Sequence, residues 1–86
     1  SGAIYGRAKK ASVEILVGGR QSGSGWFADE KGLVVTAEHV VHRKKGTIKV
    51  ISPVAGRLPA DVVALDPGHD LALLRASGPG APFPHL

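Results

Sequence analysis

The sequence predicts an all-β fold: a single small six-stranded antiparallel β-barrel with one short helical turn. Short runs of β-branched and apolar residues recur about every ten residues, with glycine- or proline-containing turns between them, a pattern typical of a sandwich or barrel. With 86 residues the chain is long enough for one domain only. It contains no cysteine, so no disulfide supplements the core. Closing the sheet into a barrel removes the exposed strand edges that a small all-β domain must protect.

Three strands are expected in the first half of the chain. Residues 11–17 carry apolar side chains at alternate positions, which predicts a strand with one apolar face. Residues 18–19 are Gly-Gly, a hairpin signal, and the second strand resumes at residues 26–28. A turn at residues 29–32 ends in a glycine suited to a left-handed conformation. The apolar run at residues 33–36 then predicts a third, buried strand.

One helical turn and three more strands are expected in the second half. The turn covers residues 37–42, because the Thr36 hydroxyl can cap it by accepting from a backbone N–H two or three residues on. Strands are predicted at residues 47–51, 58–66 and 71–75. The end of the second of these strands is apolar on both faces, so we expect it to be covered on both sides.

The two ends of the chain differ in composition from its middle. Residues 1–10 are expected to form a lead-in segment, in which Ile4 and Tyr5 cover an edge of the core. Residues 11–76 are expected to form the barrel. Residues 77–86 are rich in glycine and proline, which do not support regular structure, and we interpret them as the start of a linker.

Charge and composition argue against two function classes. The net charge is +4, and the densest basic cluster is His42-Arg43-Lys44-Lys45. No aromatic residue is interleaved with this cluster, as in proteins that bind single strands, so we interpret it as a solvated loop and expect no nucleic-acid partner. No run approaches the roughly 18 apolar residues that a membrane-spanning helix needs.

Two residues carry the candidate chemistry. His39 lies on the expected helical turn, and Asp70 lies where the last turn meets the last strand. A lone histidine in such a place is usually a cap or a surface residue. A carboxylate beside the histidine favours a catalytic role instead. The carboxylate accepts from one ring nitrogen, while the other nitrogen can take a proton from a hydroxyl. The apolar run after Asp70 is expected to keep water from the carboxylate and so strengthen the charge interaction.

A metal site is the alternative interpretation of the same region. His42 and His69 flank the candidate pair, and together with His39 they could form a cluster. Their spacing matches no standard zinc pattern, and the chain has no thiolate ligand. We therefore predict neither a metal nor a cofactor.

The surroundings of the two residues resemble a known family. Thr-Ala-Glu-His-Val-Val at residues 36–41, followed by Asp-Pro-Gly-His-Asp-Leu-Ala-Leu-Leu at residues 66–74, is similar to the first half of a trypsin-like (chymotrypsin-fold) serine protease of the HtrA (DegP-like) type. Residues 22–27 and 32–36 match the two strands that precede the histidine in that family. The motifs are short, but they occur in the right order and cover most of the chain.

The resemblance implies that the catalytic residues are divided between two barrels. This chain would be the first barrel, with His39 as general base and Asp70 as its orienting carboxylate, while Glu38 replaces a residue that is often small or an amide. The family's nucleophile lies in the second barrel, in a Gly-x-Ser-Gly-Gly stretch that is absent here. Ser24 lies in a Gly-Ser-Gly, but it matches a strand of the first barrel. We therefore expect this piece of a serine endopeptidase to be inactive alone.

The resemblance also implies partners and a location. The missing second barrel would bind in cis or in trans, and the full-length protein would act on unfolded or peptide substrates. The face that this second barrel would cover is expected to be bare and apolar, which favours homo-oligomers. The family is periplasmic, secreted or tethered to a membrane outside the cytoplasm. The alternative function is a non-catalytic β-barrel binding module derived from the protease fold.

Overall fold

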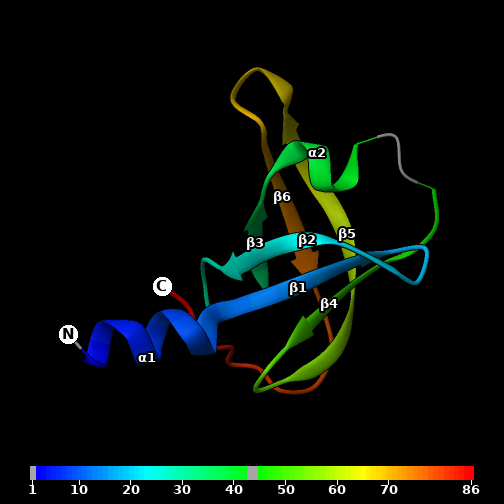
Figure 1. Ribbon diagram of the computed structural model, residues 1–86. Helices are drawn as coiled ribbons and strands as arrows, with labels where there is room; N and C mark the ends of the chain where they lie inside the picture. The colour runs from blue at the N-terminus through cyan, green and yellow to red at the C-terminus, as the bar shows by residue number, and fades with distance from the viewer. Residues whose placement is uncertain (1, 43–44) are drawn as a thin grey trace.

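The protein is a closed antiparallel barrel of six strands in a computed structural model that describes residues 2–42 and 45–86. Around the barrel the order is β1, β2, β3, β6, β5, β4, and β4 pairs with β1 to close it (Figure 1). The predicted fold class is confirmed. In chain order the elements are α1 (Gly2–Ala11), β1 (Ser12–Val17), β2 (Arg20–Phe27), β3 (Leu33–Thr36), α2 (Glu38–Val41), β4 (Ile48–Ser52), β5 (Gly56–Asp66), the 3₁₀ turn η1 (Pro67–His69) and β6 (Leu71–Ala76).

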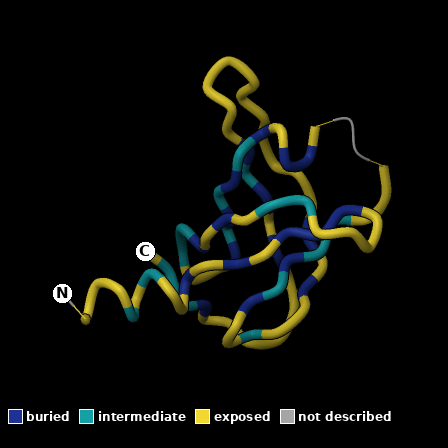
Figure 2. The backbone as a smooth tube through the Cα atoms, in the orientation of Figure 1, coloured by how far each residue is buried: buried dark blue, intermediate teal, exposed yellow. Residues whose placement is uncertain are grey.

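Every strand contributes to one apolar core. The alternation predicted for β1 is observed, since Val13, Ile15 and Val17 are all buried. Burying a side chain of this size contributes about 1.5–3 kcal/mol, and Figure 2 shows the buried segments running through the middle of the barrel. The largest fully buried side chains, one from each strand, are Phe27, Ile15, Leu58, Leu74, Val34 and Val50.

Two turns between the first three strands follow the sequence signals. Gly18 and Gly19 join β1 to β2 with φ of +61° and +82°, the pair of positive values that a type I′ hairpin requires. In the next turn Asp29 Oδ1 accepts from the backbone N–H groups of Lys31 and Leu33, both at 2.9 Å. Both turns therefore set the register of the strands that they join.

The N-terminal segment forms the helix α1 and does not cover the core. Ile4 and Tyr5 are 72% and 69% exposed, so the prediction that they cover an edge of the core is wrong. The helix points away from the barrel (Figure 1), and within it the residue classed as buried is Ala11, at the junction with β1. No helix in the described part of the chain is long and apolar enough to cross a membrane.

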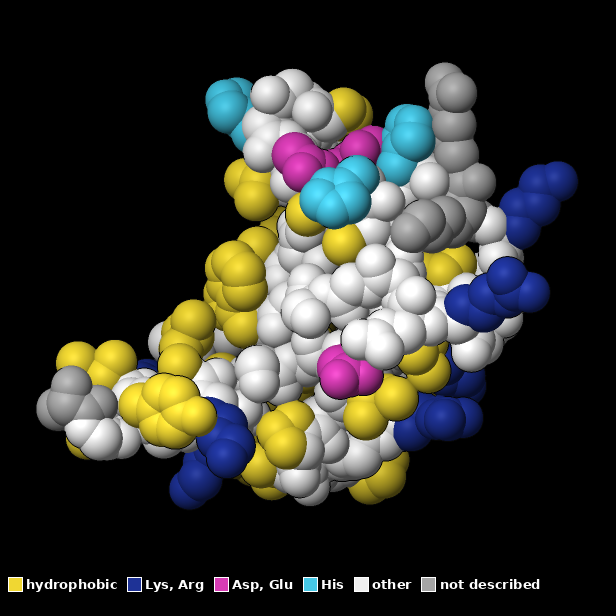
Figure 3. Space-filling view, viewed as in Figure 1, with side chains coloured by type: hydrophobic (Ala, Val, Ile, Leu, Met, Phe, Trp, Pro, Cys, Tyr) yellow, Lys and Arg dark blue, Asp and Glu magenta, His cyan; other side chains and the backbone are white. Residues whose placement is uncertain are grey.

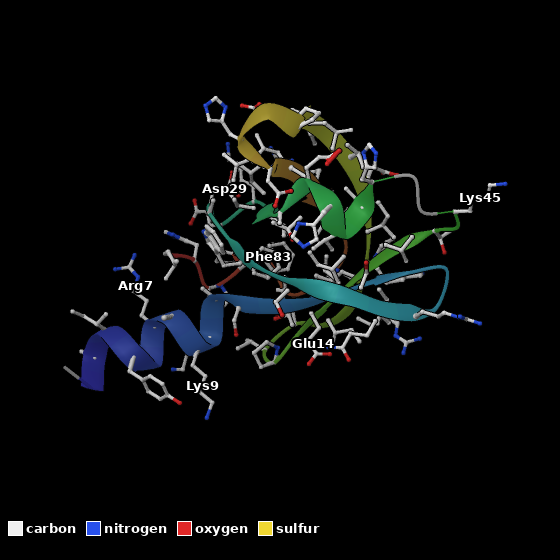
Figure 4. The ribbon with its side chains drawn as sticks, turned by 45° about the horizontal axis from the view of Figure 1, so that its top comes forward. Arg7, Lys9, Glu14, Asp29, Lys45 and Phe83 are labelled. Atoms are coloured by element: carbon white, nitrogen blue, oxygen red, sulfur yellow. The ribbon has the colours of Figure 1, made fainter. Side chains whose placement is uncertain are left out.

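The C-terminal run packs back onto the barrel. Residues 77–86 contain no helix or strand, yet the Phe83 ring is buried and stacks on Phe27, with centroids 4.7 Å apart and planes at 6°. Figure 4 shows Phe83 among the strands. The Phe83 N–H donates to the Glu30 carbonyl at 2.9 Å, and the Leu86 N–H donates to the Phe27 carbonyl at 3.1 Å. Phe83 therefore completes the core, while the domain boundary at residue 76 stays a prediction.

The end of β5 is uncovered. Together with the start of β6 it forms a hairpin, closed by η1, that projects above the rest of the barrel (Figure 1). Val62, Val63 and Leu65 are exposed, so the prediction that this end is covered on both sides is wrong. The physical reason is that β5 is longer than the strands beside it and outruns the core, as the exposed hairpin in Figure 2 makes visible.

Candidate active site

The turn that carries His39 is not capped by a side chain. The N-cap of α2 is Ala37, and no side-chain hydrogen bond caps the turn. The prediction that Thr36 caps it is wrong, because Thr36 is buried and its hydroxyl donates to the Ser24 carbonyl oxygen at 2.7 Å. Thr36 thus joins β3 to β2 at the point where the chain leaves the barrel for α2.

Small residues of β2 let α2 approach the barrel closely. A Cβ on Gly23 would lie 2.5 Å from Val40 Cγ2, and a Cβ on Gly25 would lie 2.4 Å from the Val35 carbonyl oxygen. Val40 is buried, and the Ser22 hydroxyl donates to its carbonyl oxygen. Gly23 therefore allows the close approach of α2, and Gly25 allows that of β3.

Asp70 reaches α2 from the projecting hairpin. It follows η1, where Asp66 Oδ1 accepts from the His69 N–H at 3.3 Å. Asp70 has a left-handed backbone, with φ 52° and ψ 47°. This conformation costs an L-residue roughly 1–2 kcal/mol, although aspartate tolerates it better than most. Backbone strain of this kind concentrates at functional sites, and here it occurs at a residue that the sequence singles out.

Asp70 holds the first two residues of α2. Its carbonyl oxygen accepts from the Glu38 N–H at 3.1 Å, and its Oδ1 accepts from the His39 N–H at 2.9 Å. Its Oδ2 lies 2.7 Å from His39 Nδ1. The structure therefore brings together the two residues that the sequence predicts as a pair, and one carboxylate binds both the backbone and the ring of the same histidine.

The electrostatics of the pair define the tautomer of His39. The pKa of the Asp70 carboxyl is lowered, mainly by the hydrogen bond from the His39 N–H and next by that from the His39 ring, while desolvation acts in the opposite direction. An ionised carboxylate can only accept, so Nδ1 carries the hydrogen of the shared bond. The lone pair of Nε2 is then free to take a proton.

The pair is accessible to solvent. The side chains of His39 and Asp70 are 73% and 51% exposed, and Leu71 next to Asp70 is exposed as well. The prediction that the apolar run keeps water from Asp70 is wrong for this chain. Burial in β6 begins with Ala72, one step further into the barrel, so Asp70 stands outside the core.

Two further imidazole–carboxylate contacts lie nearby, on the rim formed by residues 38–42 and the tip of the β5–β6 hairpin, residues 66–71. His69 Nδ1 lies 2.9 Å from Asp66 Oδ2, and His42 Nδ1 contacts Glu38 Oε1. Sequence reasoning missed both pairs, although their i,i+3 and i,i+4 spacings were a usable signal. Figure 3 shows histidine and acidic side chains gathered at the top of the molecule. Within the described part of the chain no three His, Cys, Asp or Glu residues are grouped so that they could hold a metal ion.

The basic cluster falls partly outside the described residues. Nothing is described of Arg43 and Lys44, so the prediction of a solvated loop is not tested there. Lys45 is exposed and points away from the barrel in Figure 4.

Known proteins resemble this chain in sequence and in structure. The family model for the trypsin-like peptidase domain matches residues 23–86. The uncharacterized protein y4bJ of Sinorhizobium fredii (strain NBRC 101917 / NGR234) is 46% identical over 54 residues, which are 63% of this chain and 8% of y4bJ. The apo crystal structure of the MamO protease domain from Magnetospirillum magneticum matches with a TM-score of 0.80 and 32% identity, over 95% of this chain and 46% of that one. The chain thus spans less than half of either protein.

Proposed function

The chain belongs to the family of trypsin-like peptidase domains, and from that premise we propose that it is the base-bearing half of a serine endopeptidase of the HtrA type. In this proposal His39 is the general base and Asp70 is the carboxylate that orients it. The observation that supports the assignment is the 2.7 Å contact between His39 Nδ1 and Asp70 Oδ2. Unlike the local contacts of His42 and His69 with carboxylates three or four residues away, this contact joins two residues that lie 31 positions apart in the chain.

The proposed chemistry uses the free nitrogen of His39. Nε2 accepts the proton of a serine hydroxyl while the serine oxygen attacks the carbonyl carbon of a peptide bond, and the imidazolium then returns the proton to the leaving amine. Asp70 stays ionised and stabilises the imidazolium. Its second oxygen, bonded to the His39 N–H, keeps the ring and the backbone of the base in one fixed relation.

The nucleophile belongs, in this proposal, to a complementary half. The chain has no Gly-x-Ser-Gly-Gly stretch, and it matches 46% of the solved MamO chain, which leaves room for a second barrel in a domain of that kind. The second half would also bring the oxyanion donors, each of which contributes about 2.7–4 kcal/mol to catalysis. Without these groups we expect the chain alone to be inactive.

An apolar hollow beside Asp70 is the surface that we assign to this complementary half. The register places Val35 opposite Leu73, and Leu73 opposite Ala64, so that three strands contribute to one face. The hollow has a volume of about 210 Å³. Its lining, apolar except for one aspartate, consists of Val35, Ala64, Leu65, Asp66, Leu71 and Leu73. An exposed apolar face of this kind marks an interaction site, and its position next to Asp70 would bring the two halves of the catalytic centre together.

The experiment is hydrolysis of a fluorogenic peptide by two separately purified halves. One half is this chain, and the other is a second barrel of a trypsin-like peptidase that carries Gly-x-Ser-Gly-Gly. We expect no turnover by either half, turnover by the mixture, and loss of that turnover with His39→Ala. The matched control is His69→Ala, which removes a neighbouring imidazole and is expected to leave turnover unchanged.

Three outcomes would contradict the proposal. Turnover by this chain alone that His39→Ala abolishes would show that the half is not inert. Turnover by the mixture that survives His39→Ala would remove His39 as the base. An inactive mixture, together with peptide binding by this chain that does not depend on His39, would favour the non-catalytic binding module.

A further inference from the structure

Glu38 is a buried carboxylate on a turn whose Val40 and Val41 are also buried and whose His39 is exposed. Its side chain is 8% exposed, while the side chain of His42, which it contacts, is 46% exposed. The contact joins Glu38 Oε1 to His42 Nδ1, and Oε1 has no hydrogen-bond partner among the described residues. A carboxylate taken out of water needs a compensating partner, and His42 is the described residue in contact with it.

The turn that these residues form depends on contacts from outside itself. α2 has four residues and no side-chain cap, and one isolated turn does not offset the entropy of its own nucleation. At its start, the N–H groups of Glu38 and His39 bind Asp70. At its end, Val40 and Val41 pack in the core, and the turn closes with the His42 N–H donating to the Glu38 carbonyl oxygen at 2.9 Å.

Glu38 takes part at both ends of the turn. Its N–H binds the Asp70 carbonyl oxygen, its own carbonyl accepts from His42, and its carboxylate contacts the His42 ring. The residue between these contacts is His39, whose own ring is largely exposed and receives its alignment from Asp70. A change in the pitch of α2 would therefore move His39 Nδ1 relative to Asp70 Oδ2.

We propose that Glu38 is a positioning residue, which through its contact with His42 fixes the pitch of α2 and so keeps His39 Nδ1 aligned with Asp70. This inference rests on the proposed function for its significance, because it concerns the base. The alignment itself is a property of the 86-residue chain and can be measured without turnover. A failure of the inference is therefore distinguishable from a failure of the proposed function.

The test is the tautomer of His39, read from the ¹⁵N chemical shifts of its ring at a pH where the ring is neutral. Free histidine prefers the Nε2–H form, whereas the bond to Asp70 requires the Nδ1–H form. We expect the Nδ1–H form in the wild type and its loss in Glu38→Ala and in His42→Leu. Glu38→Gln should retain it, because the amide has the size of the carboxylate and its oxygen can contact the same His42 nitrogen.

The matched control is His69→Gln. This change removes the imidazole that contacts Asp66 on the same rim, and it leaves α2 unchanged. It should leave the His39 tautomer unchanged, and amide dispersion in the same spectra checks that each variant is folded. If Glu38→Ala does not fold, His42→Leu decides, since it removes the contact from its half-exposed side. Retention of the Nδ1–H form in folded His42→Leu, or its loss in His69→Gln, would overturn the proposal.

Discussion

The body of the barrel and the rim that carries His39 are held together in different ways. In the body, each strand places a large side chain in one shared core, and the C-terminal run adds Phe83 to it. On the rim, α2 is a single turn, and its contacts with Asp70 are polar and largely exposed. The body is therefore held by its own packing. On the rim, Val40 and Val41 anchor α2 to the core, whereas the His39 side chain relies on a few directed hydrogen bonds.

This difference has a consequence for function. Close packing makes the body rigid. The end of β3 and the β5–β6 hairpin therefore hold His39 and Asp70 close to each other. The rim itself leaves the side chains of His39 and Asp70 exposed, and an apolar hollow beside Asp70 is uncovered. The side chains of His39 and Asp70 are already aligned in this chain, but they remain exposed to water. Charge interactions are weaker in water than in a dry environment.

The largest effect is expected in the body, from Phe27→Ala. It removes the fully buried ring against which Phe83 stacks, and such a change costs about 3–5 kcal/mol, enough to unfold much of a small domain. The matched control is Trp26→Ala, its neighbour in β2, whose side chain lies on the outer face. Urea denaturation measures both, and equal losses of stability would contradict the distinction between core and surface.

A smaller, pH-dependent effect is expected on the rim, from Asp70→Asn. Because hydrogen bonds from His39 hold the pKa of Asp70 below its ordinary value, the unfolded chain binds this proton more readily than the folded one. The stabilisation is therefore fully present above the unfolded pKa of about 4, and it is lost as the pH falls through the lower folded pKa. Asp70→Asn should flatten the acid limb of a stability–pH curve measured by urea denaturation.

The acid limb of the stability–pH curve also allows a direct comparison of the two regions. In the body, the backbone N–H of Leu33 lowers the pKa of Asp29, so Asp29→Asn should also flatten the curve below about pH 4. An unchanged acid limb in Asp70→Asn, with a flatter one in Asp29→Asn, would mean that the contacts between Asp70 and α2 are not formed in solution.

The smallest effect on stability is expected from Leu71→Glu, which changes association rather than folding. Without a complementary half, the apolar hollow is free to meet a second copy, and we expect the wild-type chain to dimerise at high concentration. A charge at Leu71 should shift the sedimentation equilibrium toward monomer with little change in stability. Val54→Glu is the control, because Val54 is also exposed and apolar but does not line the hollow. A wild-type chain that stays monomeric at all concentrations would contradict the prediction.

The body could be predicted from residue types because its signals are local. The alternation of Val13, Ile15 and Val17 defines one face of a strand, and Gly18-Gly19 defines a hairpin, without knowledge of any distant residue. Local signals were weaker at the ends of the chain. Ile4 and Tyr5 have large side chains of a kind that is often buried, and only their direction in space, set by α1, leaves them in solvent.

The sequence by itself determined the class of fold, most of the strands, and the two residues that form the His39–Asp70 pair, since each depends on residue type and spacing along the chain. Tertiary structure alone decided that Phe83 fills the core, that Thr36 binds β2 instead of capping α2, and that Asp70 remains in water. These outcomes depend on which distant groups compete for the same position or the same hydrogen bond. That competition is settled by the closed barrel, because only closure brings β2, β3 and the β5–β6 hairpin to one rim.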